Sequence, residues 1–216
     1  MSGESKFLAG IGIFTVIIIA AGIFFFSRNK PQENVNEKAD EAVLLANTKN
    51  SIGNPNSSVK IVEFADLQCP ACRTAQPIVK SILEKYKDQV YFVWRHYPLS
   101  IHKNARPAAR AAEAAATQGK FFEMADVLFT KQTEWSEKSD PKDLFTGYAQ
   151  EIELDMEKFK TDFEASYDAI DQDFADGNKV NVSSTPTFFI NGEKKSGVLK
   201  EADFDAYFGA SANTSE

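Results

Sequence analysis

The residues of this chain that are best suited to chemistry are two cysteines, Cys69 and Cys72, in the segment EFADLQCPAC at residues 63–72. An apolar run precedes them and a helix-like segment follows. Two cysteines separated by two residues at a strand-to-helix turn are typical of a redox pair, whose thiols and disulfide interconvert. The free amides and the dipole at a helix start favour a thiolate at Cys69, which makes it the attacking sulfur. Cys72, one turn later, would be the resolving thiol.

Two other uses of the cysteine pair fit the residues less well. A structural zinc site needs about four ligands, and only His96 and His102 could join the two cysteines. A structural disulfide between neighbours in one helical turn would close a very short loop and would constrain the chain little. The sequence therefore favours redox chemistry without a metal. It also requires no dissolved cofactor, because the electrons would reside on the two sulfurs.

The composition fits one domain with an appendage. The chain has 216 residues, 43% of them hydrophobic, and its 18 phenylalanines suffice for a substantial core. The formal net charge is −7, and no cluster of basic residues offsets it. We therefore expect no binding to nucleic acid, which requires a basic surface.

A run of twenty residues without a charge, FLAGIGIFTVIIIAAGIFFF, extends from Phe7 to Phe26. A helix of this length spans about 30 Å, the thickness of the hydrocarbon core of a bilayer. A cleaved signal peptide would have a shorter apolar region and small residues at its cleavage site, whereas this run ends in three phenylalanines. The sequence therefore predicts an uncleaved transmembrane signal anchor at residues 7–26, with residues 1–6 in the cytoplasm.

The charges that flank the apolar run do not settle its orientation. Lys6 precedes the run, whereas Arg28 and Lys30 follow it, so the positive charges slightly favour a cytoplasmic domain. Oxidising dithiol chemistry, however, belongs outside the cytoplasm. From the chemistry rather than from the flanks, we expect everything after residue 26 to lie on the outer side of the membrane.

The rest of the chain divides into a tether, a globular domain and a tail. Residues 27–58 are polar and predict a flexible linker, and residues 209–216 predict a frayed tail. In the domain, 59–208, strand-like runs at 59–64 and 90–94 flank the helix that carries the cysteines. Such a closely spaced strand, helix and strand imply a parallel right-handed crossover.

Helix-like patterns fill the middle of the domain, at about residues 103–177. They include an alanine-rich helix that stops at Gly119 and a last apolar stripe that stops at Gly177, since glycine often follows a helix end. A strand at 187–190 then leads into an Asn-Gly pair, the strongest short signal for a hairpin. A partner strand and a closing helix at 201–208 complete the domain.

This order of elements is that of an α/β thioredoxin fold with an inserted α-helical domain. The segment EFADLQCPAC, together with SSTPTFFING at residues 183–192, resembles the DsbA-like thiol–disulfide oxidoreductases, especially their membrane-anchored bacterial members. The resemblance covers about residues 51–208. A Cys-x-x-Cys motif is common by itself, but the two segments in this order and at this spacing are quite specific.

The resemblance assigns roles to the residues of the first segment. Cys69 matches the family's exposed nucleophile, and Cys72 matches its resolving cysteine. Pro70 and Ala71 fill the dipeptide that tunes thiolate stability and hence the redox potential.

Pro186, in the second segment, matches the family's cis-proline, which faces the active-site disulfide. A cis bond would turn the chain sharply and expose the backbone of Thr185 for pairing with an extended substrate. On the residues alone, a trans proline at the start of a strand fits equally well. The resemblance favours the cis form and makes Thr185 and Pro186 the expected substrate-binding residues.

Three further residues invite a chemical role. Glu63 lies six residues before Cys69 on a strand expected to be buried, where a carboxyl without a cation has a raised pKa and can exchange protons with a thiol. The family has an acidic residue at the matching place, so Glu63 is assigned this role; the alternative is a surface carboxylate on an edge strand. Asp66 is expected to be a turn residue, and His96 is expected to stabilise the start of the insertion.

The resemblance implies an enzyme tethered to the outer face of a bacterial cytoplasmic membrane, which introduces disulfide bonds into exported proteins. Its reoxidation implies a quinone-linked membrane partner of the DsbB or vitamin K epoxide reductase type. One alternative is a disulfide isomerase or reductase with the same fold, because the sequence does not set a redox potential. Another is a non-catalytic thioredoxin-like chaperone, which an intact cysteine pair disfavours.

Overall fold

The computed structural model describes residues 38–165 and 167–211. The predicted cytoplasmic end, the predicted transmembrane segment at 7–26 and the end of the predicted tail lie outside these residues. Within the described part of the chain, no helix is long and apolar enough to cross a membrane.

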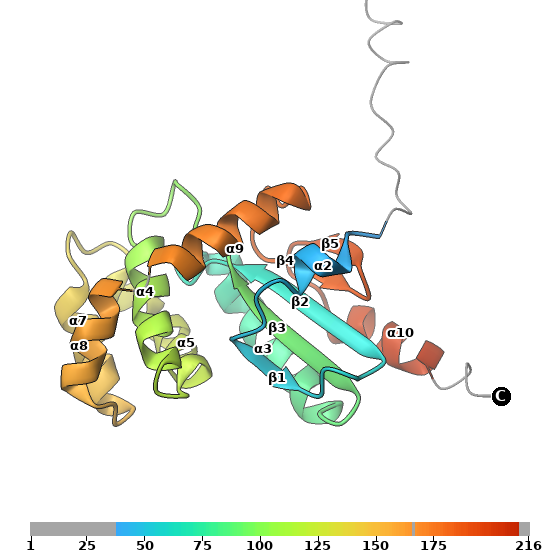
Figure 1. Ribbon diagram of the computed structural model, residues 1–216, viewed down its shortest axis with the longest axis horizontal. Coiled ribbons are helices and arrows are strands. Elements are labelled where there is room, and N and C mark those ends of the chain that lie inside the picture. The colour runs from blue at the N-terminus through green and yellow to red at the C-terminus, as the bar shows by residue number, and fades with distance from the viewer. Residues whose placement is uncertain (1–37, 166, 212–216) are drawn as a thin grey trace, which may run out of the picture. The chain divides into compact units, whose positions relative to one another are not determined.

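Five strands form one mixed sheet in the order β1-β3-β2-β4-β5 (Figure 1). β2 and β3 are parallel, and the other neighbours are antiparallel. The bounds of the strands are β1 Ser51–Gly53, β2 Val59–Ala65, β3 Val90–His96, β4 Thr187–Ile190 and β5 Glu193–Ser196. The predicted parallel pair and the predicted hairpin are therefore confirmed.

Helix α3, Pro70–Lys85, connects β2 to β3 and begins immediately after Cys69, which is its N-cap residue. The proline at the first helical position fits a helix start, where a backbone N–H is not needed. α3 packs on one face of the sheet, and α2 and α9 pack on the other (Figure 1). The cysteine pair therefore lies where the sheet meets the start of its crossover helix.

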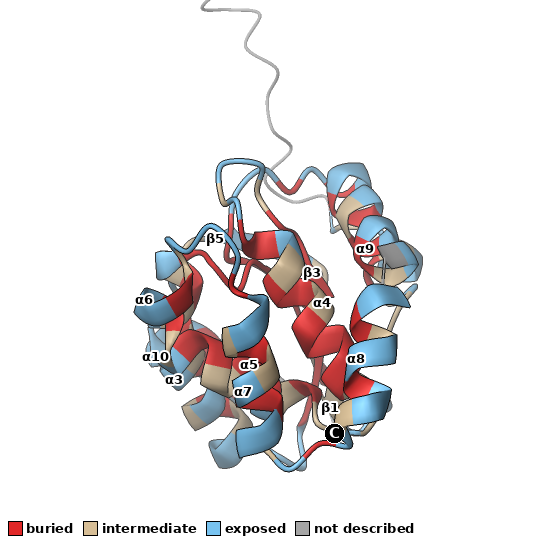
Figure 2. Cartoon of the chain, turned by 90° about the vertical axis from the view of Figure 1, so that its left-hand side faces the viewer, coloured by how far each residue is buried: buried red, intermediate tan, exposed pale blue. Residues whose placement is uncertain are grey.

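The helical insertion after β3 is confirmed. Its central helix is α4, whose alanines are buried and admit α5 and α8 at close range (Figure 2). The bounds of its helices are α4 Ala105–Ala116, α5 Phe121–Thr130, α6 Gln132–Trp135, α7 Lys142–Glu151, α8 Met156–Ala165 and α9 Tyr167–Lys179. The closing helix, α10, extends over Glu201–Ser211 and packs against α3.

The prediction of a linker over 27–58 is wrong for residues 38–58, which belong to the folded unit. Helix α2, Glu41–Leu44, buries Leu44, and β1 pairs with β3, with Ser51 opposite Val93. This segment has a polar composition, as a linker would. Several of its polar groups, however, form hydrogen bonds with distant parts of the domain. The side chain of Asn50, for example, is buried and donates to Glu113 of α4.

The predicted helix stop at Gly177 is also wrong, because α9 continues through it to Lys179. The last apolar stripe forms two helices, α8 and α9. A Cβ atom at residue 177 would lie only 2.7 Å from the ring of Tyr97. The glycine therefore permits the close approach of α9 to Tyr97, the residue that follows β3, rather than ending the helix.

Candidate active site

Cys69 is held by hydrogen bonds on both sides of the β2–α3 turn. Its backbone N–H donates to the carbonyl of Asp66 over 3.0 Å, and its own carbonyl accepts the N–H of Arg73 over 3.1 Å. Its thiol donates to the backbone carbonyl of Thr185 over 3.4 Å. The structure therefore brings the predicted nucleophile next to the predicted substrate-binding residue.

Both cysteines are free thiols, and both are buried. Cys69 is 6% exposed and Cys72 is 1% exposed. Cys69 is more exposed than Cys72, as expected for the attacking sulfur. It is nevertheless buried, whereas the resemblance implied an exposed nucleophile.

The environment of Cys69 lowers the pKa of its thiol from 9.0 to about 5. The hydrogen bond from the Cys72 side chain has the largest effect; burial opposes it, and further donors are the Thr185 side chain and the backbone N–H groups of Cys72 and Ala71. Such convergent donors stabilise a thiolate at the start of a helix. Cys69 is therefore ionised at neutral pH, as its predicted role requires.

Cys72 has the opposite electrostatics. Burial raises the pKa of its thiol well above 9.0, the hydrogen bond to Cys69 and the charge of the Cys69 thiolate raise it further, and Glu63 does so when it is ionised. Cys72 is therefore protonated at neutral pH. The two sulfurs differ in the direction expected for an attacking and a resolving cysteine.

Glu63 lies on β2 between Ile61 and Ala65, whose side chains belong to the core on the α3 side of the sheet. It is 3% exposed, and burial raises the pKa of its carboxyl from 4.5 to about 8. The alternative of a surface carboxylate is therefore wrong. Its exchange of protons with a thiol stays a prediction, which its electrostatic effect on Cys72 supports.

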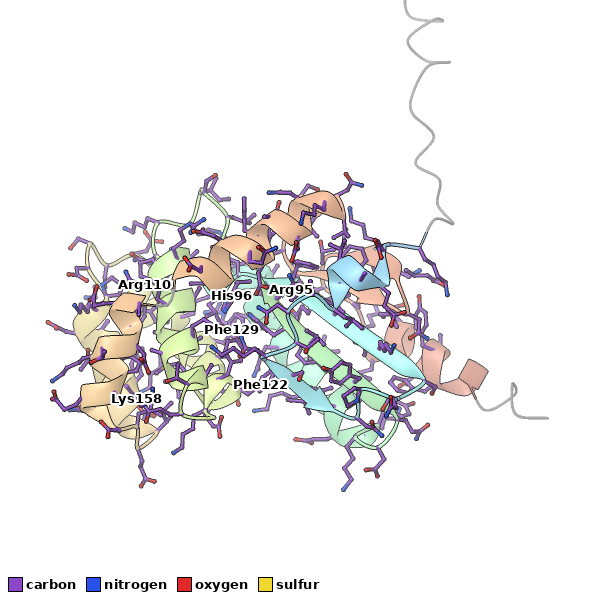
Figure 3. The ribbon with its side chains drawn as sticks, in the orientation of Figure 1. Arg95, His96, Arg110, Phe122, Phe129 and Lys158 are labelled. Carbon is purple, nitrogen blue, oxygen red and sulfur yellow. The ribbon has the colours of Figure 1, made fainter. Side chains whose placement is uncertain are left out.

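Glu63 also lines a cavity of about 120 Å³ between the sheet, α3 and α5. Most of the lining is apolar, and the aromatic rings of α5 that contribute to it, Phe122 and Phe129, lie beside the sheet (Figure 3). Its polar residues, apart from Glu63, are Gln76, Lys80 and Asp126, and Asp126 is bonded to the other two. The apolar walls explain why the Glu63 carboxyl is poorly solvated.

The peptide bond between Thr185 and Pro186 is cis, as the resemblance predicts. Thr185 is buried, and its hydroxyl oxygen has no hydrogen-bond partner among the described residues. That hydroxyl is one of the groups that can donate to a Cys69 thiolate. Thr185 therefore contacts the reacting sulfur in addition to its expected role in binding substrate backbone.

Asp66 is a turn residue, as expected. One carboxylate oxygen accepts the N–H of Gln68 over 2.7 Å, and the other accepts the N–H of Leu99 over 2.9 Å. The second oxygen also bonds to Nδ1 of His102 over 2.7 Å. Asp66 therefore ties the turn before the cysteines to the loop after β3, and His102 serves this anchoring.

His96 stabilises the junction between β3 and the insertion, as expected (Figure 3). Its Nε2 lies 3.1 Å from a carboxylate oxygen of Glu113, and its Nδ1 accepts from the indole of Trp94 over 3.4 Å. Burial raises the pKa of Glu113, but hydrogen bonds and charges from His96, Lys49 and Asn50 outweigh it and hold that pKa at about 2. Glu113 thus joins the insertion to β3 and to the chain before β1.

Three amide side chains around the turn carry no signal in the sequence. Gln68, Asn104 and Gln132 are all buried. The side chains of Gln68 and Gln132 bond to backbone groups across the boundary between the turn and the insertion, and that of Asn104 bonds to carbonyls at the end of α6. A lone glutamine or asparagine in a helical region fits no periodic pattern or spaced motif. Only the folded chain reveals that they meet.

No group of three metal-binding side chains is gathered in the described ranges, 38–165 and 167–211. The two histidines that could have joined the cysteines are bonded to acidic residues instead. The arrangement around Cys69 and Cys72 is suited to thiol–disulfide exchange, in which the sulfurs themselves react.

A family model described as Thioredoxin matches residues 45–208. Among solved structures, a thioredoxin-like oxidoreductase from Silicibacter pomeroyi is 26% identical, with a TM-score of 0.68 over 82% of this chain and 100% of that chain. The thiol-disulfide exchange protein alpha-DsbA2 from Wolbachia pipientis is 18% identical, with a TM-score of 0.68 over 78% of this chain and 90% of that chain. The second likeness concerns the fold alone.

Curated relatives match at higher identity but are much longer. The Na(+)/H(+) antiporter NhaA 3 of Salinispora tropica is 42% identical over 148 residues, which are 67% of this chain and 22% of that protein. The chain thus spans about a fifth of the length of this relative. Most of the antiporter therefore lies outside the region that matches this chain.

Proposed function

Because the chain belongs to the thioredoxin family, we propose that it is a DsbA-type oxidase, which uses Cys69 and Cys72 to introduce disulfide bonds into exported proteins. The observation that carries the proposal is the opposite shift of the two thiol pKa values. A stabilised Cys69 thiolate favours the reduced form of the pair. Favouring the reduced form makes the disulfide form a strong oxidant, which an oxidase requires.

The reaction begins with the Cys69–Cys72 disulfide and a substrate with two thiols. A substrate thiolate attacks the sulfur of Cys69, so the bond between the two cysteines breaks and a mixed disulfide forms. The second substrate thiolate then attacks the substrate sulfur of the mixed disulfide and releases Cys69 as a thiolate. Two electrons pass from the substrate to the pair, and the substrate gains a disulfide.

Protons must move with these electrons, because Cys72 leaves as a thiolate in a buried place. The raised pKa of Cys72 means that this thiolate takes up a proton at neutral pH. Glu63, whose pKa burial raises to about 8, is protonated at neutral pH and can supply that proton. It would regain a proton from solvent before the next turnover.

The reduced pair must be oxidised again by a partner that accepts two electrons. We propose a quinone-linked membrane protein, of the DsbB or vitamin K epoxide reductase type, for this step. The apolar run at residues 7–26 supports a membrane anchor that would keep the domain beside such a partner. The domain would then lie on the outer face of the cytoplasmic membrane.

The reduction potential of the Cys69–Cys72 pair, measured in exchange with glutathione, tests this proposal. DsbA has a potential of about −120 mV and thioredoxin one of about −270 mV. For an oxidase, we expect a value closer to about −120 mV than to about −270 mV. A value close to that of thioredoxin would contradict the oxidase and favour a reductase with the same fold.

The proposed location needs its own test, because the reaction could run in either compartment. A reporter fused after Glu216 that is active only outside the cytoplasm should be active in cells and should fractionate with membranes. Activity of a cytoplasm-only reporter would contradict both the location and the export of the substrates.

A further inference from the structure

A glutamine of the helical insertion reaches the backbone of the cysteine turn. The side-chain amide of Gln132, in α6, donates to the carbonyl of Leu67 over 2.8 Å and to the carbonyl of Cys69 over 3.1 Å. An amide nitrogen has two hydrogens, so one side chain bridges two carbonyls of the turn. Gln132 is 3% exposed, which makes these bonds costly to lose.

The cysteine turn also bonds to the insertion through the side chain of Gln68. Its side-chain oxygen accepts the backbone N–H of Asn104 over 2.6 Å, and its side-chain nitrogen donates to the carbonyl of Ser136 over 2.8 Å. The side chain of Asn104 donates to carbonyls of the same α6 region, at Trp135, Ser136 and Lys138. We call Gln68, Asn104 and Gln132 the amide clamp.

Helix α6, which carries Gln132, is itself fixed within the insertion. The indole of Trp135, at the end of α6, donates to the carbonyl of Leu128 over 2.8 Å and packs edge to face against the ring of Phe145. Trp135 is fully buried. A short helix held in this way gives Gln132 a defined position, so its amide can act as a fixed support for the turn.

The turn matters because Cys69 is the N-cap residue of α3. The side chain of an N-cap residue faces the free N–H groups of the first helical turn only while its backbone is extended, as it is at Cys69, with φ −69° and ψ 123°. The Cys69 carbonyl accepts the Arg73 N–H of the helix and the Gln132 amide together. The insertion therefore holds the carbonyl of the residue whose sulfur reacts.

We propose that Gln132 is a positioning residue for the redox pair, through which the helical insertion holds the turn so that the Cys69 sulfur meets its hydrogen-bond donors. The hydrogen bonds of Gln132 are made to backbone carbonyls of the turn and not to the sulfur. Gln132 acts through the carbonyls of Leu67 and Cys69, and Gln68 and Asn104 complete the support. The inference rests on the thiolate chemistry of the proposed function but not on the direction of electron flow.

The variant Gln132→Met, in the full chain, keeps the length of the side chain and removes both donors. We expect the Cys69 pKa, followed by the ultraviolet absorbance of the thiolate, to rise. We also expect the exchange equilibrium with glutathione to move by about tenfold toward the oxidised protein, the effect of about one pKa unit in thiolate stability. The release of Cys69 from its mixed disulfide by a second thiol should slow accordingly, because Cys69 becomes a poorer leaving group.

Gln118→Met is a matched control. Gln118 lies in the same insertion, and its amide likewise makes two hydrogen bonds to backbone, donating to the carbonyl of Asp155 over 3.1 Å and accepting its N–H over 2.8 Å. Both variants should lose stability in denaturant unfolding, but only Gln132→Met should shift the thiolate titration and the glutathione equilibrium. If both variants leave these two measurements unchanged, Gln132 is merely structural and the proposal is wrong.

A measurement on the unaltered protein covers the case in which Gln132→Met does not fold. The side-chain amide resonances of Gln132 should differ between the reduced and oxidised protein, since the turn that they bond to changes charge and bonding. Those of Gln118 should not differ. Gln132 resonances that are identical in both redox forms would overturn the proposal, whereas a reduction potential like that of thioredoxin would overturn only the oxidase.

Discussion

The thiol of Cys69 donates a hydrogen bond over 3.4 Å to the backbone carbonyl of Thr185, a residue 116 positions later in the chain. This bond gives the S–H donor of the neutral thiol a hydrogen-bond acceptor. When Cys69 ionises, this bond is lost, but the Thr185 hydroxyl, which has no partner among the described residues, can donate to the thiolate instead. One residue therefore offers an acceptor to the thiol and a donor to the thiolate.

The low pKa of Cys69 predicts how the stability of the reduced protein depends on pH. The pKa is about 5 in the folded chain and near 9.0 when unfolded, so the stability that this thiolate contributes is present at high pH and is lost as pH falls toward 5. The oxidised protein has no such thiol. Between pH 8 and pH 5, we therefore expect the free energy of unfolding of the reduced form to decrease relative to that of the oxidised form.

Urea unfolding of both redox forms over this pH range measures the difference, and reduced Cys69→Ser serves as the control that lacks the thiolate. Thiolate absorbance against pH gives the pKa directly. A Cys69 pKa at or above the ordinary thiol value would remove the electrostatic basis for its role as nucleophile.

Glu63 predicts a pH dependence of the opposite sign. Its pKa is about 8 in the folded chain against 4.5 ordinarily, so its contribution to stability is greatest below pH 4.5 and is lost as pH rises toward 8. Glu63→Gln stays uncharged, and it should be more stable than the unaltered protein at pH 8, by an amount on the order of a few kcal/mol. Urea unfolding at pH 5 and pH 8 measures this difference.

The same variant tests the proton exchange. Glu63→Gln cannot supply a proton to Cys72, so we expect slower turnover at neutral pH in a folded and stabilised protein. Stopped-flow measurement of disulfide reduction by a dithiol peptide reports the rate. Unchanged kinetics across neutral pH would reduce Glu63 to a buried residue without a role in the reaction.

The sequence predicted the parts of the fold that local patterns determine. The strand before Cys69, the helix after it and the second strand each follow from a short apolar run or a helix start. The hairpin follows from Asn191 and Gly192, whose φ angles of 50° and 83° are those that an Asn-Gly turn requires. Gly119 likewise has a φ of 75°, as expected after the end of a helix.

The sequence did not predict contacts that join distant polar residues. Asn50 lies in a stretch that looks like a linker, but its partner Glu113 is 63 residues away. Arg95 sits in a strand, and its two carboxylate partners lie on α9. The sequence around a single polar residue does not indicate its distant hydrogen-bond or ion-pair partner. The linker boundary, the buried ion pairs and the amide clamp therefore became visible only in the folded chain.

Arg95 predicts a large cost for breaking a buried ion pair. Its guanidinium is fully buried, bonds to Asp173 and Asp176 at 2.6 Å each, and donates to the carbonyl of Leu44. Arg95→Met would leave the buried carboxylate of Asp173 without its cation and that of Asp176 with Lys179 alone, and we expect a loss of about 3–5 kcal/mol in unfolding free energy. Hydrogen exchange should also rise in residues 38–50, which lose this attachment.

Arg106→Met is the matched control, because its ion pair with Asp171 has a similar distance of 2.6 Å but lies at the surface. That variant should lose less than about 1 kcal/mol. Equal losses for the two variants in urea unfolding would contradict the importance of burial at Arg95.

The assigned order of the two sulfurs predicts which variant traps reaction partners. In Cys72→Ser, a mixed disulfide at Cys69 cannot be resolved from within the chain. Substrates and the reoxidising partner should therefore stay covalently attached to Cys69, whose thiolate is the one stabilised at neutral pH. Cys69→Ser should trap little, because burial keeps the Cys72 thiol protonated and it is only 1% exposed.

Trapping in living cells, followed by non-reducing gels and mass spectrometry, identifies the attached proteins. Exported proteins together with a quinone-reducing membrane protein would support the proposed oxidase, whereas a membrane electron donor would favour a reductase or an isomerase. The double variant Cys69→Ser, Cys72→Ser controls for attachment that does not involve the pair. If Cys69→Ser traps as much as Cys72→Ser does, the two sulfurs do not have the roles that their burial and hydrogen bonds assign to them.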